Sequence, residues 1–265
     1  MADARCPGGP PHLVEDEPTT EVAVVFVRRG ALLRAVDGRS TVVDTASYWV
    51  ERPGTRQSIG HPLGPDVSTA LILDPHLLGS LADPDRPSLP AAALTPPAAD
   101  LAHRLLLSRS RRPSGAQDAF TLAEEVLLLA GNLLRHMVDE RPGPTRHGRD
   151  RWAKISEKAK LRLATADAGL VELARELKVS PVALSRHFHE VTGLTLGRYR
   201  RRLRVRQAVH CVAQGERNLA ALAATLGFAD QSHLTRAVRA EYGITPSRLR
   251  TGLLTRDPQA TDTVR

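Results

Sequence analysis

The sequence predicts an α+β protein: a small β-barrel or sandwich with following helices, and then an all-helical domain. Three observations support this fold class. Short apolar runs separated by turn residues fill roughly residues 21–75, which is typical of a small all-β unit. After residue 97, apolar residues recur at helical spacing instead. A helix–turn–helix unit then occurs twice, at about 170–193 and 219–243.

The predicted strands begin with the apolar run at residues 22–27. The strongest hairpin signal follows, where Asp37-Gly38 separates β-prone residues 31–36 from residues 39–43. Asp-Gly suits a two-residue turn because both of its positions require a positive φ. Further short strands are expected at residues 48–50 and 69–73, each followed by a proline-containing turn.

Two helices are predicted after this β region, at residues 98–108 and 119–138. The second has a wide apolar face at i, i+3, i+4, i+7 spacing, made of Phe120, Ala123, Val126, Leu127, Ala130, Leu133, Leu134 and Met137. Such a face either packs on its own β domain or forms a homodimer contact. The sequence favours neither interpretation over the other.

The doubled segment is the clearest feature of the chain. Leu173-Ala-Arg-Glu-Leu177 returns as Leu222-Ala-Ala-Thr-Leu226, and the Gly193 stop returns as Gly243. The offset is 49 residues before the middle of the unit and 50 after it, so one inner turn of the second copy has one more residue. Two such units in a basic region are typical of a protein that reads two neighbouring DNA grooves.

Each unit contains the start and stop signals of two short helices. In the first, Ser180-Pro181 opens the second helix, with serine as N-cap and proline at the first position, and Gly193 ends it. Asp230 is the expected N-cap in the second unit. The residues expected to face inward are Leu170, Leu173, Ala174, Leu177, Leu184, Phe188 and Val191, and then Leu219, Leu222, Ala223, Leu226, Leu234 and Val238.

A single helix at residues 199–214 is expected to join the units. An apolar stripe of Val205, Ala208, Val209 and Val212 faces inward, and arginines crowd the start of this helix at 198, 200, 201, 202, 204 and 206. A spacer of this length spans roughly 24 Å. It would hold the two reading helices about one DNA turn, ~34 Å, apart. Some of the arginines are expected to meet phosphate, and others to cover helix ends or acidic neighbours.

The distribution of charge supports a nucleic-acid partner. Residues 151–250 hold 19 Lys and Arg against 8 Asp and Glu, a net charge of +11, whereas residues 1–150 have a net charge of −3. The positive excess therefore belongs entirely to the half that contains the repeat. Such asymmetry points to a polyanion partner, and double-stranded DNA is the expected one.

Several function classes find no support. The two cysteines allow neither a disulfide framework nor a four-cysteine zinc site. No signal segment or ~20-residue apolar span is present, so a cytoplasmic protein without membrane contact is expected.

His12, His61 and His76 are isolated in the sequence, and His187 and His189 face apart on a helix, so we expect no metal site and no cofactor. No Gly-X-Ser-X-Gly motif or phosphate-binding glycine loop appears, and we expect no catalytic residues and no enzyme. Cys211 beside the apolar stripe is expected to be an inert packing residue.

Residues 154–250 resemble the DNA-binding domain of AraC-type (AraC/XylS-like) transcriptional regulators. The resemblance lies in Ser180-Pro-Val-Ala-Leu-Ser-Arg-His-Phe-His-Glu-Val-Thr-Gly193, in Arg204-Val-Arg-Gln-Ala208, in residues 222–236, and in Gly243-Ile-Thr-Pro-Ser-Arg-Leu-Arg250. It implies base contacts by Val182, Ser185, Arg186, Gln231, Ser232, Thr235 and Arg236. Phosphate contacts are expected from Ser180, Arg198, Arg201, Arg202 and Arg239.

The sequence departs from that family pattern in two places. Leu234 and Val238 stand where the family usually has aromatic residues, so a lighter second core is expected. Val182 offers only a methyl contact, so hydrogen-bond readout by the first unit depends mainly on Arg186.

The N-terminal half is similar, more loosely, to the cupin-like sensor domains of these regulators. The similarity lies in Phe26-Val-Arg-Arg-Gly30, the Asp37-Gly38 hairpin and the Pro53-Gly54 turn before His61-Pro62. It implies binding of a small effector, dimerisation, or both. The expected organisation is a flexible tail (1–20), a cupin-like domain (21–140), a linker (141–150), the DNA-binding domain (151–253) and a second tail (254–265).

The main hypothesis is therefore an effector-responsive, sequence-specific transcription factor that contacts RNA polymerase if it activates. The alternative is a small-molecule-binding or catalytic cupin-like protein that its DNA-binding domain only localises. A third hypothesis is an architectural DNA binder that tolerates any sequence.

Overall fold

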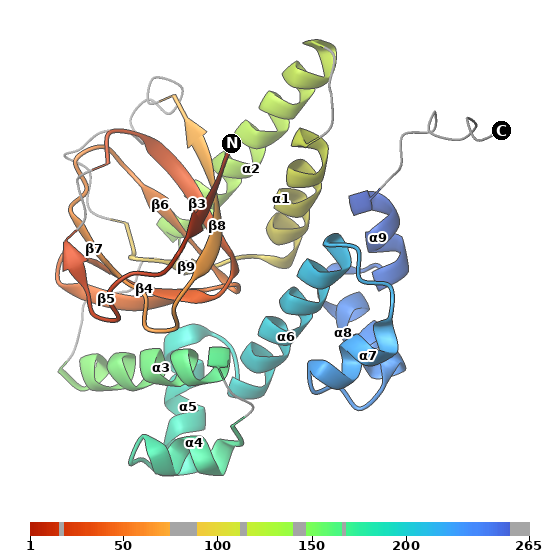
Figure 1. Ribbon diagram of the computed structural model, residues 1–265. Coiled ribbons are helices and arrows are strands. Elements are labelled where there is room, and N and C mark those ends of the chain that lie inside the picture. The colour runs from red at the N-terminus through yellow and green to blue at the C-terminus, as the bar shows by residue number, and fades with distance from the viewer. Residues whose placement is uncertain (16–18, 75–88, 112–115, 140–146, 166–167, 255–265) are drawn as a thin grey trace.

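The computed structural model describes residues 1–15, 19–74, 89–111, 116–139, 147–165 and 168–254. It confirms the α+β class: antiparallel sheets form the N-terminal half, and helices follow (Figure 1). Within those ranges, no helix has both the length and the apolar character that crossing a bilayer requires. The predicted tail at 254–265 lies almost wholly outside the described residues, as do residues 141–146 of the predicted linker.

The predicted strands are confirmed with small changes of boundary. They are β3 (Val22–Arg29), β4 (Ala31–Val36), β5 (Arg39–Asp44), β6 (Ser47–Glu51) and β8 (Asp66–Leu73). At the hairpin between β4 and β5, Asp37 and Gly38 have φ angles of 51° and 72°. This is the left-handed pair that a two-residue turn requires, which is why the local sequence was sufficient to predict it.

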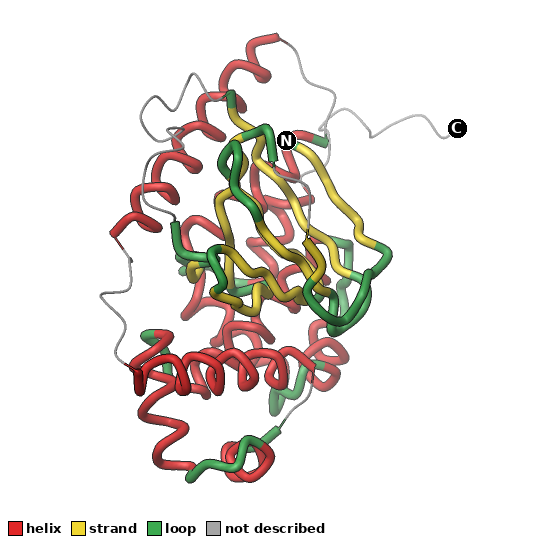
Figure 2. The backbone as a smooth tube through the Cα atoms, turned by 90° about the vertical axis from the view of Figure 1, so that its left-hand side faces the viewer, coloured by secondary structure: helices red, strands yellow, loops and turns green. Residues whose placement is uncertain are grey.

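Four more strands complete two antiparallel sheets. They are β1 (Ala2–Cys6), β2 (Val14–Glu15), β7 (Gln57–Gly60) and β9 (Ala93–Leu94). One sheet has the order β1-β8-β3-β6-β9 and the other β2-β7-β4-β5. Figure 2 shows the strands (yellow) gathered in one region, with helices beside and below them. The strands among the described residues thus form two facing sheets rather than one closed barrel.

The expectation of a loose tail at residues 1–20 is wrong. β1 pairs antiparallel with β8, from Ala2 opposite Ala70 to Cys6 opposite Asp66, and β2 pairs with β7. Backbone hydrogen bonds to an existing sheet edge hold both segments, and such bonds do not depend on an apolar pattern. Residues 1–20 therefore contain two edge strands, which their polar composition did not predict.

Helices α1 (Pro97–Ser110) and α2 (Ala116–Asp139) follow the β region. The C-terminal half of α2 packs on the sheet of β3, β6 and β8, where Leu133, Leu134 and Met137 are buried with Val24. This half confirms the interpretation that the apolar face covers its own domain. At the N-terminal half, Phe120 is 74% and Leu127 39% exposed. The homodimer interpretation stays a prediction for that half.

The helical domain has the predicted plan (Figure 1). Its helices are α3 (His147–Thr165), α4 (Leu170–Glu176), α5 (Pro181–Thr192), α6 (Leu196–Ala213), α7 (Leu219–Thr225), α8 (Gln231–Tyr242) and α9 (Pro246–Leu254). Residues 147–150 belong to α3 and so correct the predicted end of the linker.

Each helix–turn–helix unit has its own core. Leu184 and Phe188 are buried in the first, and Leu222, Leu234 and Val238 in the second. Two inward assignments are wrong: Leu170 and Val191 are each 41% exposed, because they lie in the terminal turns of α4 and α5.

Helix α6 joins the two units and also packs against the β domain. The Tyr199 hydroxyl donates to Asp44 Oδ2 at 2.6 Å, and Arg206 donates to the carbonyl oxygens of Thr45 and Thr95, both at 2.7 Å. Arg206 is only 1% exposed. The spacer helix is therefore anchored to the N-terminal domain by buried polar groups.

A buried carboxylate connects α1 to the second unit. Asp100 accepts from Arg104 Nε at 2.9 Å and from the Tyr242 hydroxyl, and it lies 3.8 Å from Arg206 Nη1. Burial alone would raise the pKa of Asp100, but the neighbouring guanidinium groups outweigh burial and hold that pKa well below its usual value. The N-terminal domain thus contacts α6 and, through α1, also α8.

Candidate nucleic-acid interface

Helix α5 begins and ends as the sequence predicts. Ser180 Oγ accepts from the backbone N–H of Ala183 at 3.2 Å, and Pro181 occupies the first helical position. Gly193 ends the helix with a φ of 71° and donates its N–H to the carbonyl of His189 at 2.8 Å. These local bonds fix both ends of α5 independently of any ligand.

Helix α8 has corresponding ends. Asp230 accepts from the N–H of His233 at 2.6 Å, and Gly243 ends the helix with a φ of 74°. The turn before each second helix needs one left-handed residue, which is Lys178 in the first unit and Gly227 in the second. Because Val179 immediately precedes its N-cap whereas Ala229 intervenes between Phe228 and Asp230, Ala229 is the added residue.

The outward side of α5 presents the predicted reader residues to solvent. Val182 is 79% exposed, Arg186 is exposed and Ser185 is half-buried. Arg186 Nη2 lies 3.1 Å from His187 Nε2, and its Nε lies 3.9 Å from Glu190 Oε1. An exposed ion pair this long contributes little, so the guanidinium can turn toward a base at small cost.

The reader residues of α8 are similarly placed. Gln231, Ser232 and Arg236 are exposed and Thr235 is half-buried, while Leu234 and Val238 on the opposite side are buried in the second core. Both second helices therefore hold their apolar side in the protein and present short polar and guanidinium side chains outward. This is the arrangement that reading base edges in a major groove requires.

The candidates for phosphate contact divide into two groups. Ser180, Arg198, Arg201 and Arg239 are exposed. Arg202 is not available in the same way, because its Nε lies 2.8 Å from Glu241 Oε1 and both side chains are largely buried. Arg202 therefore forms an internal ion pair between α6 and α8 in place of the predicted phosphate contact. Such a contact between two helices cannot be recognised from the local spacing of residues.

Two other arginines of α6 cover helix ends, as expected for part of the cluster. Arg200 Nη1 donates to the carbonyl of Ala168 at 3.1 Å, just before α4. Arg204 Nη1 donates to the carbonyl of Gly227 at 3.0 Å, just after α7. Each of these charge-assisted hydrogen bonds attaches one unit to the spacer.

The structure also changes the interpretation of one histidine in the β domain. His61 Nδ1 lies 2.8 Å from Asp66 Oδ2, and its Nε2 lies 3.6 Å from Cys6 Sγ. His61 is therefore not isolated in space, although it is isolated in the sequence. Its partners come from β1 and β8, and no local motif joins these segments.

Comparison with known proteins agrees with this geometry. A family model described as a helix-turn-helix domain matches residues 173–252. The transcriptional activator RhrA of Rhizobium meliloti is 29% identical over 133 residues, which cover 46% of this chain and 42% of RhrA. The transcriptional activator RhaS of Escherichia fergusonii is 34% identical over 80 residues, covering 30% of this chain and 29% of RhaS. The chain thus spans less than half the length of these curated relatives.

Solved structures also align with the chain. ToxT from Vibrio cholerae aligns over 95% of this chain and 96% of its own, with 13% identity and a TM-score of 0.36. The AraC-like activator CuxR aligns over 74% and 72%, with 17% identity and a TM-score of 0.36. The family model, in contrast, matches a segment that includes both α5 and α8. Residues 173–252 therefore form a helix-turn-helix domain.

Proposed function

We propose that the protein is a sequence-specific DNA-binding transcription regulator that reads two adjacent major-groove segments through α5 and α8. The observation that carries the proposal is the correspondence of these two helices. They share capping and stop geometry, each follows a turn with one left-handed residue, and both present polar side chains outward. The basic balance of residues 151–250 supplies the attraction to DNA, which does not depend on base sequence.

Each reader residue has a role in this proposal. Arg186 and Arg236 pair with guanine and Gln231 with adenine, since these side chains match two groups on the base edge. Ser185, Ser232 and Thr235 add single hydrogen bonds, and Val182 contacts a thymine methyl group. Ser180, Arg198, Arg201 and Arg239 contact phosphate. Homodimerisation, and contact with RNA polymerase at activated promoters, belong to the same proposal.

Alanine replacement of Arg186 or Arg236 should weaken binding to a selected DNA site about 10–100-fold, because a good bidentate base contact contributes ~1–3 kcal/mol of discrimination. Binding to unrelated DNA should change far less. The site is first obtained by selection from random DNA, and affinities are then measured by fluorescence anisotropy at fixed salt.

Arg201→Ala is the matched phosphate control. It should weaken selected and unrelated DNA equally and reduce the slope of log K against log salt by about 1. Equal losses on both DNAs for Arg186→Ala and Arg236→Ala would instead support an architectural binder. Selection that yields no preferred site would contradict the proposed function.

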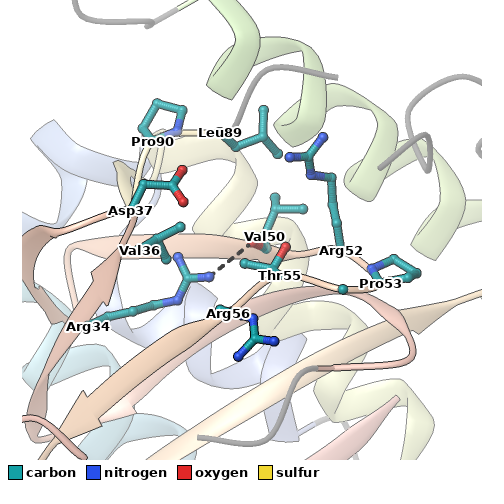
Figure 3. A pocket seen from close by; sticks show the side chains of 11 residues that line it. Arg34, Val36, Asp37, Val50, Arg52, Pro53, Thr55, Arg56, Leu89 and Pro90 are labelled. Atoms are coloured by element: carbon teal, nitrogen blue, oxygen red, sulfur yellow. Dashed lines mark hydrogen bonds between the residues drawn. The ribbon is translucent and has the colours of Figure 1, made fainter. Parts of the chain in front are cut away.

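We further propose that a small anionic effector occupies a cavity of about 390 Å³ in the β domain. Its charged lining residues are the carboxylate Asp37 and three arginines, and apolar side chains such as Val50 complete the wall (Figure 3). The arginines Arg34, Arg52 and Arg56 outnumber the one carboxylate. This volume and this mixture of a few charged groups with apolar walls are typical of small-molecule sites.

Arg34 is the strongest argument for an anion. Its side chain is buried, and the oxygens that accept from it are uncharged: Gln57 Oε1 at 2.8 Å, the Ala91 carbonyl at 2.6 Å and the Val50 carbonyl at 3.5 Å. Burial lowers the pKa of Arg34 to about 10, an effect that Glu51 opposes. Glu51 attracts the guanidinium, but a carboxylate or phosphate in the cavity would add a charged group in direct hydrogen-bond contact with it.

The anionic dye 1-anilinonaphthalene-8-sulfonate tests this cavity, since it combines a sulfonate with aromatic rings. We expect saturable fluorescence in the wild type, about tenfold weaker binding in Arg34→Met, and no change in Arg39→Ala, whose side chain is exposed and outside the cavity. Organic acids should compete better than their methyl esters. Equal competition by acids and esters would contradict an anion site.

A further inference from the structure

We propose that Cys6 is a nucleophilic thiol activated by His61 and Asp66, and that it is a modification site for small soft electrophiles. The three side chains form a line. Cys6 Sγ lies 3.6 Å from His61 Nε2, and His61 Nδ1 lies 2.8 Å from Asp66 Oδ2. This is the order of a nucleophile, a base and a group that orients the base.

The fold supplies each member from a different segment. Cys6 ends β1, Asp66 begins β8 opposite it in the sheet, and His61 follows β7. Asp66 is only 2% exposed, whereas Cys6 is half-buried. The orienting carboxylate is thus fixed in the sheet, while the sulfur remains within reach of a small reagent.

The backbone also holds the imidazole in place. The His61 N–H donates to the carbonyl of Pro10 at 2.8 Å, and the preceding residue, Gly9, lies against the ring. A Cβ at Gly9 would come within 2.8 Å of His61 Cδ2, so a side chain at that position would displace the ring. Glycine at position 9 is therefore needed for the observed arrangement.

The chemistry follows from these contacts. With Nδ1–H donating to Asp66, the lone pair of Nε2 faces the thiol and accepts its proton, leaving a thiolate beside an imidazolium that Asp66 stabilises. Attack on iodoacetamide forms an S–C bond and releases iodide. Attack on hydrogen peroxide forms an S–O bond and breaks the O–O bond. The sulfur is oxidised to a sulfenic acid, and the hydroxide that leaves takes the proton from His61 as water.

The same three residues could in principle hold a metal ion, since their ligand atoms lie within 4.8 Å of one another. Asp66, however, contacts Nδ1 of the imidazole, whereas the sulfur of Cys6 faces the other ring nitrogen, Nε2. Asp66 is thus placed to orient the imidazole, and structural zinc sites use four protein ligands where this cluster offers three. The arrangement favours activation of the thiol.

Cys211 provides an internal reference. It lies on α6, burial raises the pKa of its thiol, and its nearest polar partner is the Gln207 amide at 3.9 Å. No other cysteine occurs in the chain. Cys211→Ser therefore isolates Cys6, and Cys6→Ser isolates the reference thiol.

Alkylation by iodoacetamide at pH 7 with EDTA, followed by intact-mass spectrometry, tests the proposal. In the Cys211→Ser background, Cys6 should react about tenfold faster than in the same protein carrying His61→Gln, because the glutamine side chain cannot accept the proton of the thiol. Asp66→Asn and Gly9→Ala should give intermediate rates. Gly9→Ala retains all three functional groups, so it separates positioning from loss of a group.

Hydrogen peroxide with dimedone capture gives the second arm and should label Cys6 in preference to Cys211. Circular dichroism confirms that each variant is folded. A rate for Cys6 equal to that of the urea-unfolded chain, or one that His61→Gln and Gly9→Ala both leave unchanged, would overturn the proposal. Labelling by iodoacetamide alone would restrict the site to alkylating electrophiles. None of these outcomes depends on DNA binding, so the two proposals fail independently.

Discussion

Replacing Arg206 with alanine should lower the free energy of unfolding by about 3–5 kcal/mol, the usual cost of removing one partner from a buried ionic group. The side chain is 1% exposed and donates to the carbonyls of Thr45 and Thr95. Alanine would leave both carbonyls without that donor and would remove a cation from beside Asp100. Urea unfolding monitored by circular dichroism measures the change.

Two further variants define the cause. Arg201→Ala on the same helix should change stability by less than ~0.5 kcal/mol, since its side chain is exposed. Arg206→Lys should recover little, because one ammonium group lacks the planar fork that reaches two carbonyl oxygens. A loss below 1 kcal/mol for Arg206→Ala would show that this contact does not hold the domains together.

Arg206 also bears on the proposed regulation. An effector in the β domain changes DNA affinity only if its binding alters contacts that the DNA-binding helices share. Helix α6 carries both units, and it touches the β domain through Tyr199 and Arg206. Asp100 extends the same buried network to Tyr242 at the end of α8. This network is the physical connection through which the proposed effector site and the DNA interface would be coupled.

The sequence was most informative where the structure depends on local chemistry. The Asp37-Gly38 turn, the Ser180 and Asp230 caps and the Gly193 and Gly243 stops each involve residues within a few positions of one another, and all are confirmed. The repeat gave a second, independent sign of the same unit. The reader residues lie on the exposed sides of α5 and α8, but their contacts with bases remain predictions.

Features that depend on distant segments were not predictable in this way. Arg202 and Arg206 belong to one run of arginines, yet one pairs with Glu241 and the other is buried against Thr45 and Thr95. Which arginine turns inward depends on how α6 lies against the β domain and against α8, and no spacing rule contains that information. For the same reason, the sequence did not predict strand β1 or the contact of His61 with Cys6, since both depend on residues far apart in the chain.

A histidine buried in the α1 contact gives the last prediction. His103 is 1% exposed and stacks on Phe26 with ring centroids 4.0 Å apart. Burial lowers its pKa from 6.5 to about 3. The Asp100 carboxylate opposes this lowering of the pKa, and the Arg104 guanidinium reinforces it. The unfolded chain therefore binds a proton at this position between about pH 6.5 and 3, whereas the folded chain does not. Stability must fall as the pH falls through that window.

The expected contribution is about 1.4 kcal/mol per pH unit, or about 2–3 kcal/mol between pH 6.5 and 4.5. Over this range the pKa of Asp100 is too low for its carboxylate to take part, and its own contribution is lost only below the usual aspartate pKa near 4. His210, whose pKa burial lowers to about 4, adds to the decline both in the wild type and in the variant compared with it.

His103→Phe retains an aromatic ring against Phe26 but cannot be protonated. Urea unfolding at several pH values should therefore show a shallower decline for His103→Phe than for the wild type, while His189→Phe at an exposed position should follow the wild type. Parallel curves for the wild type and His103→Phe would mean that His103 is protonated in the folded protein, and hence that the α1 contact is open to water.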